Sequence, residues 1–479
     1  MHLGFEELKL DGARMGWLQS ALGLQALSER IRWRRERARN ARLTVVSQFF
    51  PPDFAATGQF IDDLSRRLAE RGLQTLVLTG QPGYAYHSDR AERIEFQHNR
   101  CIRRTSVSRF WPTRIRGRVV NSLLFCMRTT MRLLRQARRG DLLLFTTEPP
   151  YLPIVGWLIY LLTRAPYIIL IYDLYPDIAV SLDVVSESQP MVRLWRWLHS
   201  QTFASAQELI VLSDSMRDRI KQHYPQVRTS ISIIPSWADP AKIKPIQRSK
   251  NWFVQRHNLS DAFTVMYSGN QGRCHDLMTL LDAAQHLKDN SKIRFLVVGS
   301  GAQHRQLVLR VADQKLTNVV FLPYQDADAL PAMLAAADLA VVSLLAAAEG
   351  QVAPSKLYGH LAAGSPLAVI CSERSYLRRE VSNAGCGNSF RTGEGKRLAN
   401  WIIQLASDPD LCQKLSLASR RHLLATATPD LVVQAYAEVL ARHLPLDQKA
   451  YASPLHQQAI PLPHPDARVI TSRQGAPQP

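Results

Sequence analysis

The stretch EGQVAPSKLYGHLAAG, residues 349–364, places groups suited to anion binding at the start of an expected helix. Pro354 suits the first turn of a helix. Ser355 and Lys356 place hydrogen-bond donors at the helix end where the backbone dipole is positive. Lys356 is therefore a candidate phosphate contact, and the alternative is a solvated surface lysine without a ligand.

A second candidate anion site is SGNQGR, residues 268–273, which follows an expected strand and precedes an expected helix. Gly269 and Gly272 allow the backbone to approach a bulky anion, and the N-terminus of the next helix supplies N–H groups. Arg273 adds a fork of donors that fits phosphate. An ordinary turn that needs small residues explains the two glycines equally well.

Acidic side chains follow a strand in the other half of the chain. The stretch YDLYPD places Asp173 and Asp177 at the end of an apolar run. Such carboxylates hold a sugar hydroxyl or act as a base, or else they cap the helix that follows, and the sequence leaves these roles open. Gly58, in FFPPDFAATG, lies at the mouth of the first expected helix.

The chain is strongly basic, with 59 Lys and Arg against 40 Asp and Glu and a formal charge of +19. This excess predicts an anionic partner: nucleic acid, anionic lipid or a phosphorylated substrate. Nucleic-acid contact through Phe110 and Trp111 is the weaker interpretation, because no nucleic-acid-binding motif accompanies them. We therefore expect no nucleic-acid partner.

Much of the basic charge lies around an expected amphipathic helix. No acidic residue occurs between Glu95 and Asp141. Apolar side chains within this stretch share one helix face and have arginines around them: Val120, Leu123, Leu124, Met127 and Met131. Basic amphipathic helices bind anionic membrane surfaces. The pattern favours that partner over a helix that packs its apolar face into the core.

Strands and helices alternate from residue 42 onward, which predicts parallel sheets covered by helices. The carboxyl ends of such strands bind ligands, and we expect ligands at that edge of both sheets. A polar, proline-containing stretch at 236–258 is the expected linker. The expected parts are a basic extension (1–41), an N-terminal doubly wound domain (42–240), a C-terminal one (255–428), a closing helix (429–444) and a disordered tail (445–479).

Several classes of protein are disfavoured. The six cysteines are scattered without a CxxC pair, so we expect neither a disulfide framework nor structural zinc, and a reducing cytoplasm fits. The N-terminus lacks the apolar segment that is typical of a signal peptide. The apolar stretch at 151–172 is interrupted by Arg164 and Pro166 and falls short of the ~20 residues of a membrane span. We interpret it as a buried helix followed by a buried strand.

Five motifs, in this order, resemble those of family-4-type glycosyltransferases of the GT-B fold over about residues 42–443. They are FFPPD followed by TG, SGNQGRCHDLMTLLDAA, FLPYQDADALPAMLAAADLAVVSL, APSKLYGHLAAGSPLAVI and AGCGNSF. The likeness is nearest to the colanic-acid (WcaI-like) branch, whose members build cell-surface polysaccharides, often on lipid-linked acceptors. It implies an α/β architecture of two doubly wound, Rossmann-like domains that face each other across a cleft.

The resemblance also implies a retaining hexosyltransferase that uses a nucleotide-diphosphate sugar as donor, without a metal or other cofactor. Backbone amides and basic side chains would carry the charge of the leaving diphosphate. Carried over residue by residue, the catalytic candidates are Arg273, Lys356, Asp173 and Glu349. The donor-binding candidates are Gly58, Gly269, Asn270, Gly272, Tyr324, Pro354, Ser355 and Leu357.

This chain departs from the family pattern at two places. Many relatives carry two glutamates at a fixed spacing, and the second binds the nucleotide ribose. Those positions fall on Gln351 and Gly359 here, although Glu349 lies two residues before the first. Loss of a hydrogen bond between a carboxylate and a ribose hydroxyl lowers the binding free energy by about 1.5–3 kcal/mol, which weakens donor binding without abolishing it. Many relatives also have a histidine where Tyr172 precedes Asp173, which leaves the acceptor-side base open.

Three functions are compatible with these features of the sequence. The first is sugar transfer to a lipid-linked or polysaccharide acceptor, by a protein bound peripherally at the cytoplasmic face of the cell membrane. A nucleotide-sugar epimerase has the same two-domain architecture but no use for a basic, lipid-facing surface. A membrane-associated scaffold that only binds a sugar nucleotide or a partner enzyme fits the missing ribose carboxylate. We expect the first.

Overall fold

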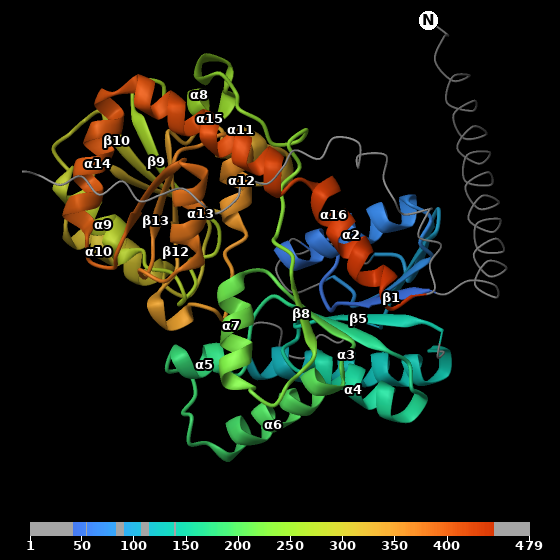
Figure 1. Ribbon diagram of the computed structural model, residues 1–479. Helices are drawn as coiled ribbons and strands as arrows, with labels where there is room; N and C mark the ends of the chain where they lie inside the picture. The colour runs from blue at the N-terminus through green and yellow to red at the C-terminus, as the bar shows by residue number, and fades with distance from the viewer. Residues whose placement is uncertain (1–41, 54, 83–90, 107–114, 138–139, 445–479) are drawn as a thin grey trace, which may run out of the picture.

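The computed structural model describes residues 42–53, 55–82, 91–106, 115–137 and 140–444. The expected extension (1–41), the expected tail (445–479) and the Phe110–Trp111 pair lie outside these residues. Within the described part, the chain forms two mainly parallel sheets covered by helices (Figure 1), as the alternation of strands and helices predicts.

The N-terminal sheet has eight strands in the order β3-β4-β2-β1-β5-β6-β7-β8, and β3 runs antiparallel to β4. The central strands are continuous apolar runs, such as LLLFT and YIILI, because helices cover both faces of the sheet. The strands are β1 (Leu43–Val46), β2 (Thr75–Thr79), β3 (Ile94–Gln97), β4 (Arg100–Arg104), β5 (Leu142–Thr146), β6 (Tyr167–Ile171), β7 (Glu208–Val211) and β8 (Ser230–Ile233).

The helices of this domain lie on two sides of the sheet (Figure 1). On one side, α2 (Ala56–Glu70) packs against the C-terminal helix α16 (Pro429–Ala441). The other side is covered by α3 (Ile115–Gln136), α4 (Leu152–Thr163) and α6 (Pro190–Ser205). The shorter helices α5 (Asp177–Ser181) and α7 (Asp214–His223) follow β6 and β7. Ser213 caps α7, because its hydroxyl accepts the Met216 N–H at 3.3 Å.

The C-terminal sheet is parallel, with its strands in the order β11-β10-β9-β12-β13-β14. Its strands are β9 (Phe263–Ser268), β10 (Ile293–Val298), β11 (Val319–Leu322), β12 (Leu339–Ser343), β13 (Leu367–Ile370) and β14 (Gly387–Phe390). Its helices are α8 (Trp252–Arg256), α9 (Met278–His286), α10 (His304–Asp313), α11 (Leu330–Leu334), α12 (Lys356–Ala363), α13 (Tyr376–Ala384), α14 (Gly395–Ser407) and α15 (Pro409–Thr426).

Helix α4 corrects one expectation. The strand that follows it is buried as predicted, but the helix itself is not: Leu158, Leu161 and Leu162 are 40%, 46% and 61% exposed. The opposite side of α4 packs closely on the sheet, where a Cβ on Gly156 would lie 2.9 Å from the Phe145 ring. Because both sides of α4 are apolar, periodicity could not reveal the outward one. No helix in the described part of the chain is long and apolar enough to cross a membrane.

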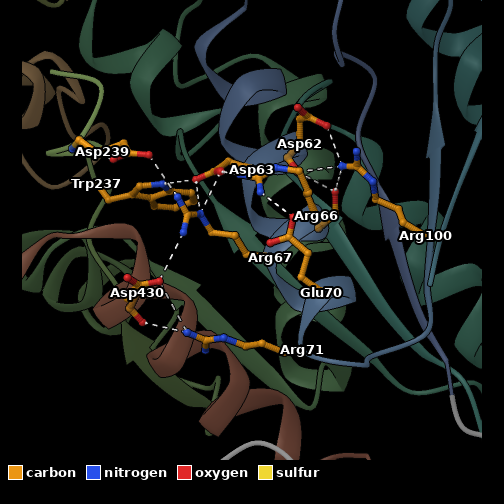
Figure 2. Close-up of polar contacts among 12 residues, drawn as sticks. Asp62, Asp63, Arg66, Arg67, Glu70, Arg71, Arg100, Trp237, Asp239 and Asp430 are labelled. Carbon is orange, nitrogen blue, oxygen red and sulfur yellow. Dashed lines mark hydrogen bonds and ion pairs between the residues drawn. The ribbon is translucent and has the colours of Figure 1, made fainter. Parts of the chain in front are cut away.

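A polar network joins the N-terminal domain to the two segments that connect it with the C-terminal domain (Figure 2). The carboxylate of Asp63, in α2, accepts hydrogen bonds from Trp237 at 2.9 Å and from Arg67 at 3.0 Å. Arg67 also pairs with Asp239 in the linker, at 3.3 Å, and with Asp430 in α16, at 3.4 Å. Although desolvation opposes them, these contacts hold the pKa of Asp63 below its ordinary value. Arg67 therefore contacts both connecting segments.

Replacing Arg67 with Ala is expected to lower the free energy of unfolding by about 1–3 kcal/mol, because carboxylates from three segments lose a partner. Arg66→Ala is the matched control, since among the described residues Arg66 pairs only with Asp63 and Glu70 of the same helix, and its side chain is more exposed than that of Arg67. That variant is expected to lose less than about 1 kcal/mol. Urea denaturation measures both values. Equal losses would show that Arg67 does not join the domains energetically.

Candidate active site

The expected anion-binding loops meet at one edge of the C-terminal sheet. The strand order reverses between β9 and β12, and ligands bind at such reversal points outside the carboxyl ends of the strands. The loop that follows β9 contains Gly269 and Gly272, and the loop that follows β12 leads into α12. The structure thus places the two stretches that the sequence indicates beside each other.

Lys356 turns its ammonium group back onto the loop after β9. Its Nζ donates a hydrogen bond to the Tyr267 hydroxyl, lies 3.9 Å from the centre of that ring and is 3.5 Å from His275 Nε2. A Cβ on Gly269 would lie 3.6 Å from the same Nζ, and the φ of +118° there also favours glycine. The cation and the glycine backbone are therefore neighbours, as a phosphate site requires.

The charge of Lys356 is sensitive to a ligand. Burial lowers the pKa of Lys356 to about 7, so that near neutral pH the amine is only partly charged. Burial and the charge of Lys356 lower the pKa of His275 to about 3, so this imidazole is neutral. His275 Nδ1 donates to the Ser343 carbonyl at 2.6 Å, which leaves Nε2 as an acceptor facing Lys356. A bound anion would raise the pKa of Lys356 and restore its full charge.

Neighbouring turns extend the loop into a continuous backbone surface. Gly299 has a φ of +117°, and a Cβ there would lie 2.2 Å from the carbonyl oxygen of Gly269. The side chain of Asn270 occupies the space beside Gly301, where a Cβ would lie 2.5 Å from Oδ1. The Tyr324 hydroxyl donates to a carbonyl of the 299–301 turn at 3.1 Å. The predicted donor-binding residues Asn270 and Tyr324 therefore lie at the same edge as Lys356.

Four other candidates differ in what they can offer a ligand. Arg273 is exposed, and none of the described residues pairs with its guanidinium. Ser355 precedes α12, but its hydroxyl caps no backbone N–H of the helix. Pro354 is buried, and Leu357 is part of the core, so Leu357 can offer a ligand only its N–H at the start of the helix. In the part of the chain described, no cluster of His, Cys, Asp or Glu could hold a metal ion.

Two carboxylates from the N-terminal domain complete the candidate site. Asp173 follows β6, and Glu148 occupies the same strand-end position after the neighbouring strand β5. Burial raises the pKa of Asp173 to about 6, and burial together with the charge of Asp173 raises that of Glu148 to about 7. Glu148 is hydrogen-bonded to Thr57, next to Gly58 at the start of α2, while its Oε2 has no partner. Sequence reasoning missed Glu148, although TTEPP places an acid after a strand as YDLYPD does.

Asp177, the other acid of YDLYPD, has a structural role. Its side chain is 1% exposed, and its carboxylate accepts hydrogen bonds from Arg196 at 2.9 Å and from the Tyr224 hydroxyl at 3.1 Å. His223 lies 3.2 Å from the same carboxylate. These contacts join α5, α6 and α7. Asp177 thus neither caps its helix through its side chain nor faces a ligand, and Asp173 is the acid available to one.

Asp173 lies where the two domains touch. It forms an antiparallel bridge with Val352, in the loop that leads into α12. The thiol of Cys274, in the loop after β9, has its pKa raised to about 11 by burial; Lys356 opposes this rise and Asp173 adds to it. Asp173 and Lys356 are therefore both within electrostatic reach of Cys274. An acid of one domain faces the cationic loop of the other, which is an arrangement suited to a reaction between two bound molecules.

Family comparisons cover both domains. The family model described as "Glycosyl transferase 4-like domain" matches residues 56–237, and the one described as "Glycosyl transferases group 1" matches residues 249–422. The chain is a group 1 glycosyltransferase. The family predicted from the order of the five motifs is thereby confirmed.

Two relatives of this glycosyltransferase carry names that point to polysaccharides or sugars. The chain is 25% identical over 368 residues to the "Probable glycosyltransferase WbjE" of Pseudomonas aeruginosa, which covers 76% of this chain and 89% of the relative. It is 32% identical over 146 residues to the "Putative colanic acid biosynthesis glycosyl transferase WcaI" of Escherichia coli K12. The second match covers 30% of this chain and 35% of WcaI, so the likeness to that branch is partial.

Solved structures confirm the GT-B fold. Sucrose-phosphate synthase from Thermosynechococcus elongatus superimposes with a TM-score of 0.66 at 16% identity, over 84% of this chain and 98% of that one. HepE from Anabaena, in complex with UDP-glucose, has a TM-score of 0.60 at 16% identity, over 84% and 99%. WaaG, a glycosyltransferase involved in lipopolysaccharide biosynthesis, has a TM-score of 0.61 at 15% identity, over 83% and 99%.

The first of the two family glutamate positions joins the domains in this glycosyltransferase. Gln351 is buried, and its amide donates to the Ser181 hydroxyl at 2.9 Å and to the Ala347 carbonyl at 2.7 Å. Glu349, two residues earlier, turns toward α13, where one oxygen accepts the Tyr376 N–H at 3.3 Å and the other is buried without a partner. Of the predicted catalytic residues, Lys356 and Asp173 are the two that both lie within electrostatic reach of Cys274.

The second position shows why a glycine is present. A Cβ on Gly359 would lie 3.0 Å from Leu334 Cδ1 at the end of α11. Glycine therefore lets α12 pack against α11 without displacing the Leu334 methyl group, and the carboxylate that the family resemblance implies at this position is absent. The next residue, His360, accepts or donates a hydrogen bond with Ser268 at 2.9 Å and fixes α12 on the end of β9.

Proposed function

We propose that this glycosyltransferase moves a sugar, with retention of configuration, from a nucleotide-diphosphate sugar to a lipid-linked or polysaccharide acceptor in cell-surface polysaccharide synthesis. The observation that carries the proposal is the position of Lys356 and the Gly269 loop opposite Asp173. The UDP-glucose bound by HepE supports a nucleotide-sugar donor. The likeness to WcaI, a "Putative colanic acid biosynthesis glycosyl transferase", and to WaaG, an enzyme of lipopolysaccharide biosynthesis, supports an acceptor of one of these kinds.

The reaction assigns a task to each part of the site. The bond between the anomeric carbon and the diphosphate oxygen breaks, and its electron pair leaves with the diphosphate. Lys356 and the N–H groups at the start of α12 stabilise that charge, because they are already held in position before it develops. Because the configuration is retained, the acceptor hydroxyl forms the new bond to the anomeric carbon on the face from which the diphosphate departs, and Asp173 takes its proton on that side. Glu148, while protonated, donates a hydrogen bond to the acceptor sugar through its unpartnered oxygen.

The test begins with a panel of nucleotide sugars, because a ligand that binds the folded protein raises its unfolding temperature. The best donor is then incubated with and without polyprenyl-diphosphate-linked sugars, and the products are separated by mass. Transfer to the lipid, with the donor's anomeric configuration in the product, supports the proposal. An isomerised nucleotide sugar formed without acceptor would identify an epimerase instead. Donor binding without formation of either product would indicate a non-catalytic scaffold.

Gly359→Glu is expected to tighten donor binding by about tenfold or more, since a restored carboxylate–ribose bond is worth about 1.5–3 kcal/mol. The Leu334 methyl group that a Cβ meets is the end of a flexible side chain and can move aside. Gly359→Ala is the control, because it has the same Cβ without the carboxylate. Calorimetric titration with the chosen donor gives both affinities. If the Glu and Ala variants bind equally, the ribose does not lie beside α12.

A further inference from the structure

Helices α3, α4 and α6 expose large apolar side chains on their outer sides. Examples are the pairs Leu123 and Met127 on α3, Leu161 and Leu162 on α4, and Leu194 and Trp197 on α6. Their exposed fractions lie between 46% and 61%. On each helix such residues recur at a spacing of three or four, or are adjacent, so each helix presents one apolar stripe outward. We call the outer surface of α3, α4 and α6 the three-helix face.

The three stripes form one surface, because the helices lie side by side (Figure 1). Trp157 of α4 contacts Trp197 of α6, with their ring centres 6.3 Å apart. Tyr151, at the start of α4, donates its hydroxyl to the Val119 carbonyl of α3 at 3.1 Å. The inner sides of the same helices pack on the N-terminal sheet. The outer stripes therefore belong to a single layer of helices, and within the described part of the chain these side chains are exposed.

The charged side chains that the three helices themselves carry are basic, and Glu187, which precedes α6, is paired with Arg196 of that helix at 2.6 Å. None of the three helices contains an acidic residue. Arg116 and Arg135 lie near the two ends of α3, Arg193 lies on α6 and Arg164 follows α4, and all four are exposed. A symmetric dimer through this face would bring two basic surfaces together, which is unfavourable. A bilayer with anionic head groups offers apolar chains to the leucines and phosphates to the arginines.

We propose that the three-helix face docks this protein on an anionic lipid bilayer. The sequence indicates only α3 as a membrane contact, and the structure adds α4 and α6 to it. Helix α4 starts next to Glu148 in the candidate site, and Leu161 lies ten residues beyond Tyr151, or about 15 Å along the helix. Docking would therefore hold the acceptor side of the site close to the lipid surface. The proposal stands whether the acceptor is a lipid or a free polysaccharide.

Co-sedimentation of the full chain with vesicles of equimolar phosphatidylcholine and phosphatidylglycerol tests this proposal. The wild-type protein is expected to bind, and the Leu161→Asn/Leu162→Asn variant to have a partition coefficient lower by about tenfold or more. Arg116→Gln/Arg135→Gln/Arg193→Gln is expected to lose a similar factor, and to show little remaining dependence on salt. The matched control is Leu309→Asn/Leu417→Asn, which alters equally exposed leucines of the C-terminal domain and should bind as the wild type does.

Each variant is shown to be folded by an unchanged unfolding temperature and an unchanged stabilisation by the donor. The arginine variant leaves the apolar residues in place, so it tests the electrostatic part of membrane binding separately. Equal binding to pure phosphatidylcholine vesicles at high salt would overturn the proposal, as would wild-type binding by the Leu161→Asn/Leu162→Asn variant. The wild-type protein could instead fail to bind vesicles and elute as a dimer, while the Leu161→Asn/Leu162→Asn variant elutes as a monomer. That result would show that the face joins two copies of the chain. Failure of sugar transfer in the donor panel leaves these outcomes unaffected.

Discussion

Replacing Lys356 with Ala is expected to lower kcat for sugar transfer by about 10²–10³-fold, the usual loss when one preorganised donor to a developing negative charge is removed. The Lys356 ammonium group lies between the Tyr267 hydroxyl and the Gly269 backbone, where the leaving diphosphate would be bound. Lys288→Ala is the matched control, because Lys288 is exposed and precedes β10 at the opposite edge of the same sheet. Initial-rate measurements at saturating donor and acceptor separate the two variants.

The pH dependence of donor binding distinguishes a phosphate contact from a structural lysine. Because burial lowers the pKa of Lys356 to about 7, the amine is cationic below that pH and increasingly neutral above it. Donor affinity is therefore expected to fall as the pH rises above 7. A bound diphosphate raises the pKa, so binding above pH 7 takes up a proton, which calorimetry in buffers of different ionisation enthalpy detects. If Lys356→Ala still takes up a proton on donor binding, the proton is bound by another group.

The fold and part of the site follow from local sequence patterns. Runs such as LLLFT and YIILI are long enough and apolar enough to be recognised as buried parallel strands. Once strands and helices alternate, the doubly wound arrangement puts the loops after β9 and β12 at one edge, although about 80 residues separate them along the chain. Gly269 and Pro354 mark those loops by their backbone preferences, and Lys356 follows from the helix that begins there.

Other features depend on contacts between distant segments, which no local pattern encodes. Gly359 is explained by Leu334, which belongs to another helix. The TTEPP stretch marks Glu148 as an acid after a strand, but its place beside Asp173 follows only when β5 and β6 are neighbours and Thr57 approaches it. The role of Gln351 requires Ser181 of the other domain. The exposed side of α4 is hidden because its sequence is apolar all round, so the sheet alone decides which side turns inward.

Asp173→Asn is expected to lower kcat by about 10²–10⁴-fold, the range for loss of a general base. Asparagine has nearly the same shape as aspartate, so the bridge between residue 173 and Val352 is kept while the carboxylate that would take the acceptor's proton is removed. Asp183→Asn is the control, because Asp183 is exposed after α5 and its φ of +54° is one that asparagine tolerates. The control should retain wild-type kcat.

The pH profile of kcat/KM for the acceptor tests whether Asp173 acts by accepting a proton. Burial raises the pKa of Asp173 to about 6, so the wild-type rate should fall as the pH drops below 6 and the carboxylate becomes protonated. Asp173→Asn should lose that acid limb along with most of its rate. Glu148→Gln keeps a hydrogen-bond donor and an acceptor at that position, so it should raise KM for the acceptor more than it lowers kcat. A residual rate in Asp173→Asn that still falls below pH 6 would place the proton acceptor elsewhere, with Glu148 the next group to test.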